Sequence, residues 1–494
     1  MPTKMQSGFH YAGKVKWLNQ VAFGVISLLT PMTLSAVEGL ATKPNVVIIF
    51  MDDMGYGDIG PFGSQLNRTP NLDRMAAEGM KLTSFYCAPV CSSSRAQMMT
   101  GCYSKRVSIS GALMPVVKEG LNPAEHTVAE LLQQQGYATM CIGKWHLGDQ
   151  PEFLPTSQGF DHFVGLPYSN DMGGTNTKRT EPVIISPKGK DRPPLPLLRD
   201  QVVVEAPVDQ TKLTELYTEE SLKFITTNKD KPFFLYMPHC AMHVPINPGS
   251  DFAGKSKNGA YGDWVEETDW GVGRILDTLR SLQIDKNTMV IFTSDNGPWL
   301  PFGKNAGIAG PLRGGKFSCW EGGMREPTIA WWPGRIPAGS TCDAMASNID
   351  MLPTLVALAG GVVPSDRIID GRDIWPLLSG KSTESPHDAL YYWSGLTLAA
   401  VRSGEWKLMV AEQKEGKAKE EADASTDKQP FAPQLYNLNN DIGETQDVAA
   451  QHPEEVKRLI ALIERMDKDL GARGSKALGI RPVGKVDKPQ PLLK

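Results

Sequence analysis

Residues Asn45–Met51 (NVVIIFM), followed at once by Asp52 and Asp53, decide the fold class of this chain. A continuous run of apolar and mostly β-branched residues is typical of a parallel strand that is buried on both faces. In α/β folds, ligands bind beyond the carboxyl ends of such strands, which is where this chain has two adjacent carboxylates. The sequence therefore predicts an α/β protein whose functional site lies just after this strand.

Beyond this strand, amphipathic stretches alternate with short apolar runs. The helix expected over 70–79 begins with a threonine and a proline and closes at a glycine, which are common start and stop signals. Further helices are expected over 126–135, 213–227, 263–282 and 351–359, and further strands over 137–142, 232–237 and 288–293. This alternation predicts a large, mostly parallel sheet sandwiched by helices.

The pattern changes near residue 376, where short apolar runs follow one another without long helices between them. We expect strands over 389–393, 399–402, 406–410 and 434–438, and an amphipathic helix over 453–470. These elements predict a smaller C-terminal α+β subdomain with a short antiparallel sheet and a helix. The predicted organisation is a signal peptide over 1–36, a catalytic domain over 43–375 and this subdomain over 376–494.

Two segments are expected to lack regular structure. The proline-rich stretch 182–207 is interpreted as an irregular insertion near the rim of the site. The charged stretch 412–428 has almost no apolar residues and is predicted to be a solvated loop.

The composition excludes several classes of protein. The 494-residue chain has 51 Lys and Arg against 55 Asp and Glu, and this net charge of −4 does not fit a general nucleic-acid binder. Its hydrophobic fraction of 41% is enough for a large core and excludes global disorder. Only the stretch near residues 17–34 is apolar enough to concern a membrane, so a polytopic membrane protein is excluded as well.

The N-terminus is typical of an export signal. Three lysines precede the apolar run 21–29, and the small residues Ser35 and Ala36 follow it. We expect cleavage after Ala36 or nearer Ala41, with an uncleaved membrane anchor as the alternative. Cleavage after Ala36 removes three lysines and no acid, so the mature chain would carry a net charge of −7. The protein is therefore expected in the periplasm or outside the cell, without a stable membrane span once the signal is removed.

Oxygen-bearing side chains follow two of the expected strands. Asp52 and Asp53 come after the first strand, and Asp295 and Asn296 come after the strand at 288–293. Carboxylate and amide oxygens suit Ca²⁺ or Mg²⁺ rather than Zn²⁺, and adjacent carboxylates repel each other unless a cation holds them. Taken separately, the Asp-Asp and Asp-Asn-Gly sequences could simply form turns. Together they favour a metal site.

Two more of the expected strands are followed by basic residues. Lys144 and His146 come after one of them, and His239 and His243 come after the other. Because the carboxyl ends of parallel strands lie along one edge of a sheet, four separate segments are expected to meet at one site.

The segment Cys91-Ser-Ser-Ser-Arg95, followed by Thr100-Gly101, resembles the signature of the type I, formylglycine-dependent sulfatases. In that family the cysteine is oxidised to formylglycine, whose hydrated aldehyde attacks the sulfur atom and whose second hydroxyl then expels sulfate. An ordinary serine ester would instead have to be hydrolysed by water. Ser93 stands where the family commonly has proline or alanine.

The chain from about residue 45 to residue 448 resembles the same family, and it is most similar to arylsulfatase A-like enzymes of the alkaline phosphatase-like superfamily. The matching segments are 52–58, 69–73, 143–148, 166–171, 243–245, 293–297 and 312–327. Several motifs in the family's order identify the chain as sulfatase-like. Of the two histidines near residue 240, the resemblance selects His243, because Val-Pro follows it, and leaves His239 as a structural candidate.

The resemblance implies a metal site and a modified nucleophile. One Ca²⁺, with Mg²⁺ the poorer fit, would be held by Asp52, Asp53, Asp295 and Asn296 and contacted by Cys91. Cys91 would act as the nucleophile after conversion to formylglycine (3-oxoalanine) by a formylglycine-generating or sulfatase-maturating enzyme.

The resemblance also implies roles for the residues around this nucleophile. The oxygens of the sulfate group would be bound by Lys144, Ser169, His243 and Lys316. Arg95 would orient the nucleophile, and Asp295 would accept its proton. His243, helped by Lys316, would protonate the leaving oxygen, and His146 would take the proton from the second hydroxyl so that sulfate is released.

Seven cysteines are too few for a disulfide scaffold. Conversion of Cys91 would leave six. Cys87 and Cys102, which flank it, could pair or lie buried.

The sequence predicts an exported sulfuric ester hydrolase that releases inorganic sulfate from sulfate monoesters. Sulfated carbohydrates are the expected natural substrates, and aryl sulfates the expected model substrates. A phosphonate or phosphate ester hydrolase on the same fold is the alternative, because some relatives share the nucleophile. A non-catalytic glycan-binding protein that keeps only the fold is a third hypothesis. No nucleic-acid partner is expected.

Overall fold

The structure, a computed structural model, describes residues 42–173, 193–413, 431–472 and 477–493. The predicted signal peptide over 1–36, most of the charged stretch 412–428 and the first part of the proline-rich stretch 182–207 lie outside these residues. Among the helices of the described part, none combines the length and the apolar character needed to cross a membrane.

The apolar strand β1 (Asn45–Met51) lies in the middle of an eleven-stranded mixed sheet. The central strands follow one another in the order β9-β1-β8-β4-β5 and are all parallel. Besides β1, these central strands are β4 (Ala138–Lys144), β5 (His162–Leu166), β8 (Phe233–Pro238) and β9 (Thr288–Ser294). Strands β1, β4, β8 and β9 are buried along their whole length, which explains their continuous apolar runs.

Further strands extend the sheet on both sides. Beyond β9 lie β10 (Arg325–Trp331), β2 (Met80–Tyr86), β11 (Ser340–Cys342) and β12 (Ala346–Ser347). Beyond β5 lie the antiparallel strands β6 (Leu197–Arg199) and β7 (Val202–Glu205). The prediction of an irregular segment over 182–207 is therefore wrong for residues 197–205. Four described prolines, at positions 193, 194, 196 and 207, flank short strands at the edge of the sheet, where a missing backbone donor is tolerated.

The register of the central strands sets the positions of the site residues. Met51 lies opposite Ser294 in the β1–β9 pair, so Asp52 and Asp295 leave the sheet side by side. Strand β8 ends at the same edge, and His239 follows it there. The strand ends thus deliver polar groups to one edge of the sheet, as expected.

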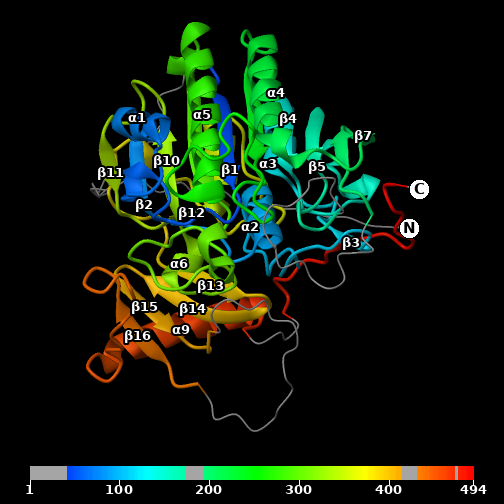
Figure 1. The fold of residues 1–494 in the computed structure, drawn as a ribbon. Coiled ribbons are helices and arrows are strands. Elements are labelled where there is room, and N and C mark those ends of the chain that lie inside the picture. Colours follow the sequence, from blue (N-terminus) through cyan, green and yellow to red (C-terminus); the bar gives the residue numbers. More distant parts are fainter. Residues whose placement is uncertain (1–41, 174–192, 414–430, 473–476, 494) are drawn as a thin grey trace, which may run out of the picture. The chain divides into compact units, whose positions relative to one another are not determined.

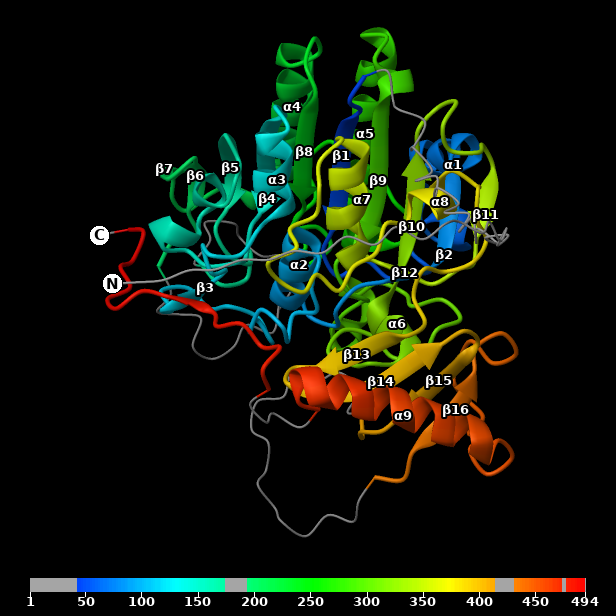
Figure 2. The same cartoon turned by 180° about the vertical axis from the view of Figure 1, so that it is seen from behind.

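Helices cover both faces of this sheet. One face carries α1 (Pro70–Glu78), α4 (Leu213–Thr227) and α5 (Gly259–Ser281), as Figure 1 shows. The other face carries α2 (Cys91–Thr100), α3 (Val128–Gln134) and α7 (Met351–Leu358), as Figure 2 shows. Val47, Ile49 and Met51 point toward the first face and share its apolar core with side chains of α1, α4 and α5. Two short helices, α6 (Glu321–Met324) and α8 (Trp375–Leu378), lie in the connections.

The C-terminal elements form a second, smaller sheet. Its four antiparallel strands are β13 (Leu390–Ser394), β14 (Thr397–Ser403), β15 (Trp406–Met409) and β16 (Gln434–Asn437). Helix α9 (Pro453–Leu470) covers one face (Figure 2), and the other face packs through Tyr392 and Tyr436 against Trp320 and Met324. The predicted α+β architecture of this region is confirmed, while the boundary at residue 376 stays a prediction. Farther on, β17 (Gly484–Lys485) pairs with β3 (Glu119–Gly120).

Most of the expected helices and strands lie within a few residues of their predicted positions, and α4 and α9 coincide with the predictions. Helix α2, in contrast, was not predicted. All ten of its residues are buried, so it has no polar face and no amphipathic period in its sequence.

Candidate active site

Helix α2 begins at Cys91, whose side chain is only 2% exposed. Burial raises the pKa of this thiol, and the ammonium groups of Lys144 and Lys316 oppose that increase. The first N–H groups of a helix have no intrahelical partner and carry partial positive charge. Cys91 therefore lies where a helix N-terminus and two lysines create a positive environment.

The two cysteines that flank Cys91 lie buried and unpaired. Cys87 donates to the backbone carbonyl of Ser294 at 3.2 Å, and Cys102 lies 3.2 Å from the guanidinium of Arg481. Of the two possibilities left open by the sequence, burial without a disulfide is the one that the structure shows.

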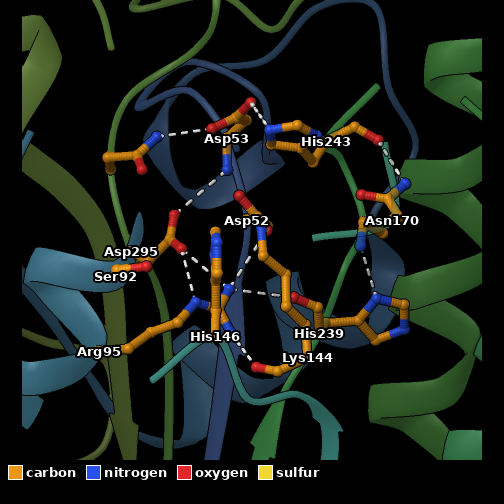
Figure 3. A network of polar contacts seen from close by, with 12 residues as sticks. Asp52, Asp53, Ser92, Arg95, Lys144, His146, Asn170, His239, His243 and Asp295 are labelled. Atoms are coloured by element: carbon orange, nitrogen blue, oxygen red, sulfur yellow. Dashed lines mark hydrogen bonds and ion pairs between the residues drawn. The ribbon is translucent and has the colours of Figure 1, made fainter. Parts of the chain in front are cut away.

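Arg95, one turn further along α2, connects the strand ends (Figure 3). Its Nε and Nη2 atoms donate to Oδ2 of Asp295 at 3.1 and 2.8 Å, and Nη2 lies 3.3 Å from Oδ2 of Asp52. It also donates to the backbone carbonyls of Lys144 and His239. A buried guanidinium with this many directional bonds fixes α2 relative to β1, β4, β8 and β9.

Lys144, the last residue of β4, forms an ion pair with Oδ2 of Asp52, and both side chains are fully buried. Burial by itself would raise the pKa of Asp52. Lys144, His243 and Arg95 outweigh that effect and hold the pKa below its ordinary value. Asp52 is therefore a carboxylate that remains charged although it is buried.

Asp53 connects the segment after β9 to Lys316. Its Oδ1 atom accepts from Nδ2 of Asn296 at 2.7 Å and from Nζ of Lys316 at 2.6 Å. Its Oδ2 atom lies 3.7 Å from Nε2 of His243. Burial alone would lower the pKa of Lys316, but Asp53 outweighs it and raises that pKa, so the lysine stays charged.

Three of the four side chains predicted to bind a metal have a buried oxygen without a hydrogen-bond partner in the described part of the chain. These atoms are Oδ1 of Asp52, Oδ2 of Asp53 and Oδ1 of Asn296. A buried acceptor without a partner costs about 1–3 kcal/mol, which a bound cation would offset. In addition, Asp52, Asp53 and His243 offer ligand atoms that lie within 4.8 Å of one another. The residues present therefore fit a divalent metal ion.

Asp295 differs from the other three predicted ligands because both of its oxygens have partners. Oδ1 accepts from the backbone N–H of Asp53 at 3.4 Å, and Oδ2 accepts from Arg95. Burial and the nearby charge of Asp52 raise the pKa of Asp295, against the opposing effect of Arg95. This carboxylate is the member of the cluster that is best prepared to hold a proton.

His146 has one ring nitrogen without a partner. Its Nε2 atom lies 3.0 Å from the backbone carbonyl of Leu113. A carbonyl can only accept, so Nε2 carries the proton and Nδ1 is left as a buried acceptor that has no partner among the described residues. Burial, with Lys144 next in effect, lowers the pKa of His146 well below its usual value. His146 is therefore a neutral imidazole with a lone pair to accept a proton.

His243 and His239 have different ring environments. Nδ1 of His243 lies 2.6 Å from the backbone carbonyl of Val244, so Nδ1 carries a proton and Nε2 faces Asp53. Nδ1 of His239 instead accepts from the backbone N–H of Ala241 at 2.8 Å. Burial, with Lys316 next in effect, lowers the pKa of His243, so its Nε2 atom is an acceptor that must take up a proton before it can donate one. The backbone contact of His239 agrees with a structural role.

Ser169 lies in the loop after β5 and is 1% exposed. Its neighbour Asn170 donates to the backbone carbonyl of His243 at 3.2 Å (Figure 3). The loop that carries the predicted sulfate-binding serine is therefore attached to the loop that carries the predicted acid.

Left-handed backbone conformations occur at three non-glycine residues in or next to this site. The φ angles are 57° at Asp53, 61° at His146 and 70° at Phe317. Non-glycine residues rarely adopt such angles, and those that do are concentrated at functional sites. The backbone is strained where it presents a carboxylate, an imidazole and the neighbour of Lys316.

Contacts and electrostatic interactions join nearly all predicted site residues in one buried cluster. Its members are Asp52, Asp53, Cys91, Arg95, Lys144, His146, His243, Asp295, Asn296 and Lys316. Ser169 is connected to it through Asn170.

Two residues of the site, Asn170 and Ser92, were not selected from the sequence, and a third, Trp299, lies beside the matching segment 293–297. Asn170 holds the loop of His243, and the ring of Trp299 lies 5.3 Å from that histidine and 4.6 Å from Nζ of Lys316. The hydroxyl of Ser92 accepts a hydrogen bond from the backbone N–H of Leu113, and the carbonyl of Leu113 in turn contacts His146. Asn170 and Ser92 lie inside the matching segments 166–171 and 91–95, but their contacts are with residues far apart in the chain, which local spacing does not indicate.

The chain matches known families over most of its length. The model described as Sulfatase matches residues 44–362, and the model described as C-terminal region of aryl-sulfatase matches residues 385–477. Over 391 residues the chain is 42% identical to N-acetylgalactosamine-6-sulfatase of Canis lupus familiaris, which covers 75% of this chain and 72% of that protein. It is 38% identical over 453 residues to arylsulfatase A of Homo sapiens, and this match covers 87% of this chain and 88% of that protein.

A solved structure has the same fold. The PsFucS1 sulfatase from Pseudoalteromonas sp. superposes with a TM-score of 0.77 at 31% sequence identity, and the match covers 88% of this chain and 92% of that chain. The fold and the motif order thus agree with the resemblance inferred from the sequence.

Proposed function

This chain belongs to the sulfatase family and is a sulfuric ester hydrolase, and we propose that it is an exported enzyme that hydrolyses sulfate monoesters of sulfated carbohydrates. One observation carries the proposal: a buried cysteine at a helix N-terminus lies among three cations and three carboxylates. The cations Arg95, Lys144 and Lys316 would offset the charge that develops on a sulfate group as its ester bond breaks.

Cys91, oxidised by a maturation enzyme and hydrated, would supply the hydroxyl that attacks sulfur. A single Ca²⁺, held by Asp52, Asp53, Asp295 and Asn296 with contact from residue 91, would supply positive charge at the same point. Ca²⁺ is proposed rather than Mg²⁺ because it accepts irregular sets of protein oxygens, whereas Mg²⁺ requires a regular octahedron and retains water.

His243 is assigned to proton transfer although it lies within reach of the same carboxylates. Oxygen atoms, not imidazole nitrogens, are the preferred ligands of Ca²⁺. Nδ1 of His243 is occupied by the carbonyl of Val244, so Nε2 is the atom that would deliver a proton to the leaving oxygen. Oδ2 of Asp53, 3.7 Å away, would stabilise the charged imidazolium before transfer.

Two other groups complete the proposed proton transfers. Asp295, whose pKa is raised by burial, would accept the proton of the attacking hydroxyl while Arg95 holds its carboxylate in place. His146 would accept a proton at its unpartnered Nδ1 atom during release of sulfate.

The remaining polar residues are assigned to binding. Lys144 and Lys316 would each contact sulfate oxygens, together with the hydroxyl of Ser169 and with His243. Arg95 would hold residue 91 and Asp295 in fixed positions relative to each other through its bonds to the strand ends. These roles explain why charged groups are buried here at considerable cost.

The relative from dog is named for N-acetylgalactosamine 6-sulfate, and we propose this sugar sulfate as the first natural substrate to test. Release of inorganic sulfate would be measured for this sugar, for sulfated sugars with the ester at other positions and for 4-nitrophenyl sulfate. The proposal requires turnover of sulfate monoesters. A higher kcat/KM for a matched aryl phosphonate than for the aryl sulfate would instead support the phosphonate ester hydrolase.

Maturation and export have direct tests. Mass spectrometry of the peptide that contains residue 91, from active protein, should find formylglycine in place of cysteine. N-terminal sequencing of the exported protein should show that the mature chain begins after Ala36 or near Ala41. An active enzyme whose residue 91 is entirely unmodified cysteine would rule out the proposed nucleophile.

A further inference from the structure

Lys316 lies in an irregular segment, which we call the Lys316 segment and define as residues 312–321. It contains no strand and only the first residue of a helix, α6. Gly314 and Phe317 have positive φ angles of 71° and 70°. A segment of this kind has few hydrogen bonds of its own, so the position of Lys316 depends on what surrounds it.

On one side, the Lys316 segment contacts the loops of the candidate active site. The backbone N–H of Lys316 donates to the carbonyl of Pro298 at 3.0 Å, and that of Phe317 donates to the carbonyl of Pro89 at 2.9 Å. These carbonyls belong to the loops that follow Asp295 and precede Cys91. The contacts connect Lys316 to the nucleophile and to the predicted metal ligands.

On the other side, the segment is held by side chains of the C-terminal sheet region, by which we mean the described residues of 390–444. Lys407, on β15, donates from Nζ to the carbonyl of Cys319 at 2.8 Å, and Oε1 of Gln413 accepts from the N–H of the same residue at 2.8 Å. Oε2 of Glu444 accepts from the N–H of Glu321 at 2.7 Å. The backbone that follows Lys316, at Cys319 and Glu321, is therefore fixed by three side chains from outside the catalytic sheet.

Lys407 is also the centre of a buried ion cluster. Its Nζ atom lies 2.9 Å from Oε1 of Glu321 and 2.7 Å from Oε1 of Glu444, and the three side chains are fully buried. The hydroxyls of Tyr86 and Tyr392 donate to Glu321 at 2.6 and 3.0 Å. Such a network has little freedom to shift, because any displacement leaves a buried charge without a partner.

We propose that Lys407 is a positioning residue for the sulfatase reaction, which acts by holding the Lys316 segment so that the ammonium of Lys316 stays beside Asp53 and Cys91. The inference rests on the proposed function, because that function assigns Lys316 to the sulfate and the leaving oxygen. Lys407 touches none of the reacting groups. Its effect on catalysis passes through Lys316.

A double-mutant cycle tests this route. We expect Lys407→Met to lower kcat/KM for a sugar sulfate by about 10- to 100-fold, since displacements of about 1 Å at a reacting group have effects of that size. In a Lys316→Ala background, the same Lys407→Met change should lower kcat/KM by less than about threefold, because the residue it positions is gone. If the loss of kcat/KM in the double variant equals the product of the losses in the two single variants, the proposal is overturned.

The leaving group supplies a second signature. If Lys407 acts through Lys316, Lys407→Met and Lys316→Ala should both harm sugar sulfates, which are poor leaving groups, more than 4-nitrophenyl sulfate, which is a good one. A role in stability alone would lower the rate on both substrates by the same factor, in proportion to the folded fraction. Equal losses on both substrates would contradict positioning.

Gln413→Ala covers the case in which Lys407→Met does not fold. Gln413 is half-buried and makes a single contact with Cys319, so its removal should be tolerated, and we expect kcat/KM to fall about three- to tenfold. Asn437→Ala is the control: this amide is also half-buried in the C-terminal sheet region, and the hydrogen bonds of its side chain join it to Glu405, Asn439 and Asn440, outside the Lys316 segment. Equal activity of Gln413→Ala and Asn437→Ala, at equal Tm, would overturn the proposal.

Native protein is assayed first on the sugar sulfates and on 4-nitrophenyl sulfate. Absence of turnover of all of them by fully matured native protein would overturn the proposed function and this inference with it. Turnover by the native protein, combined with multiplicative losses in the cycle, would overturn the inference alone.

Discussion

Two buried clusters of charged side chains differ in how completely their polar atoms are paired. In the candidate active site, Asp52, Asp53 and Asn296 each keep one oxygen without a partner in the described part of the chain. Around Glu321, by contrast, both carboxylate oxygens accept hydrogen bonds, one from Tyr392 and Lys407 and the other from Tyr86 and Arg325.

The difference distinguishes a site from a structural connection. A folded protein gains nothing by burying an acceptor that nothing satisfies, so the unpartnered oxygens indicate a ligand that is absent from the chain itself. In the second cluster, Oε1 of Glu444 also accepts no hydrogen bond, but it lies 2.7 Å from the ammonium of Lys407, whose charge compensates it without a ligand. This cluster serves to attach the C-terminal sheet to the catalytic part. Charge and burial are similar in the two clusters, and only the pairing separates them.

The largest expected effect concerns the nucleophile. Cys91→Ala should lower turnover of sulfate esters at least about 1,000-fold, because no other residue of the cluster can supply the attacking hydroxyl. Cys87→Ala is the matched control: this cysteine is also buried and unpaired, four residues earlier, and the variant should keep activity within about threefold. Comparable kcat values for the two variants would contradict the assignment of Cys91.

The next effect concerns the paired cluster. Glu321→Gln should lower the free energy of unfolding by about 3–5 kcal/mol, since it leaves Lys407 buried with half of its compensating charge. Urea unfolding of the variant measures this change. Glu219→Gln breaks the exposed pair with Arg274 instead and should change stability by less than about 0.5 kcal/mol. A stability loss below about 1 kcal/mol for Glu321→Gln would show that the cluster is not a structural connection.

Metal removal should affect only the cluster with unpartnered oxygens. Chelation should abolish most activity, and Ca²⁺ at about 100 times its Kd should restore about 2.7 kcal/mol of stability, seen as a rise of a few degrees in Tm. Asp53→Asn should lose this response to Ca²⁺, whereas Glu321→Gln should keep it at a lower starting Tm. A Ca²⁺ response that survives in Asp53→Asn would place the metal elsewhere.

The smallest effect concerns a buried carboxyl that forms no ion pair with any residue that the structure describes. Burial raises the pKa of Glu267 to about 7, against the hydrogen bond from the backbone N–H of Gly249. The folded state then keeps a proton that the unfolded state releases, so stability is greatest below the unfolded pKa and falls as pH rises toward 7. Native protein should lose on the order of 2 kcal/mol between pH 5 and pH 7.5 from this group.

Glu267→Gln should flatten that part of the pH profile, measured as Tm in buffers of equal ionic strength. Glu219→Gln, at an exposed position of the preceding helix α4, is the control and should leave the slope unchanged. A variant at Glu267 with the native slope would show that the carboxyl is ionised in the folded protein.

The sequence predicted the part of the site that depends on strand ends. Asp52 and Asp295 could be placed together because each directly follows an apolar run, and parallel strands end at one edge. Cys91 and Lys316 were found through motif resemblance, since nothing in their local pattern indicated burial. Helix α2 was missed for the same reason, because a helix buried on all sides has no polar face to produce a period.

Contacts between distant residues could not be predicted. The pairing of Lys407 with Glu321 joins residues 86 positions apart, and the strands β6 and β7 lie in a stretch whose prolines indicated irregular structure. In both cases, charged side chains or backbone groups find their partners in distant parts of the chain, and the local sequence does not indicate these partners. An unpartnered oxygen, which distinguishes the two clusters, is likewise visible only once every neighbour has been placed.

The connectivity of the main sheet has a consequence for the order of events during synthesis. Met51 pairs with Ser294 and Tyr86 pairs with Arg325, so these neighbours of the two strand ends near residue 91 are made more than two hundred residues after it. Until those strands emerge and pair, the chain around Cys91 lacks part of the surface that buries it in the finished fold. A modifying enzyme thus has the time of a long stretch of translation to reach a side chain that the finished fold encloses, and folding itself would end that access.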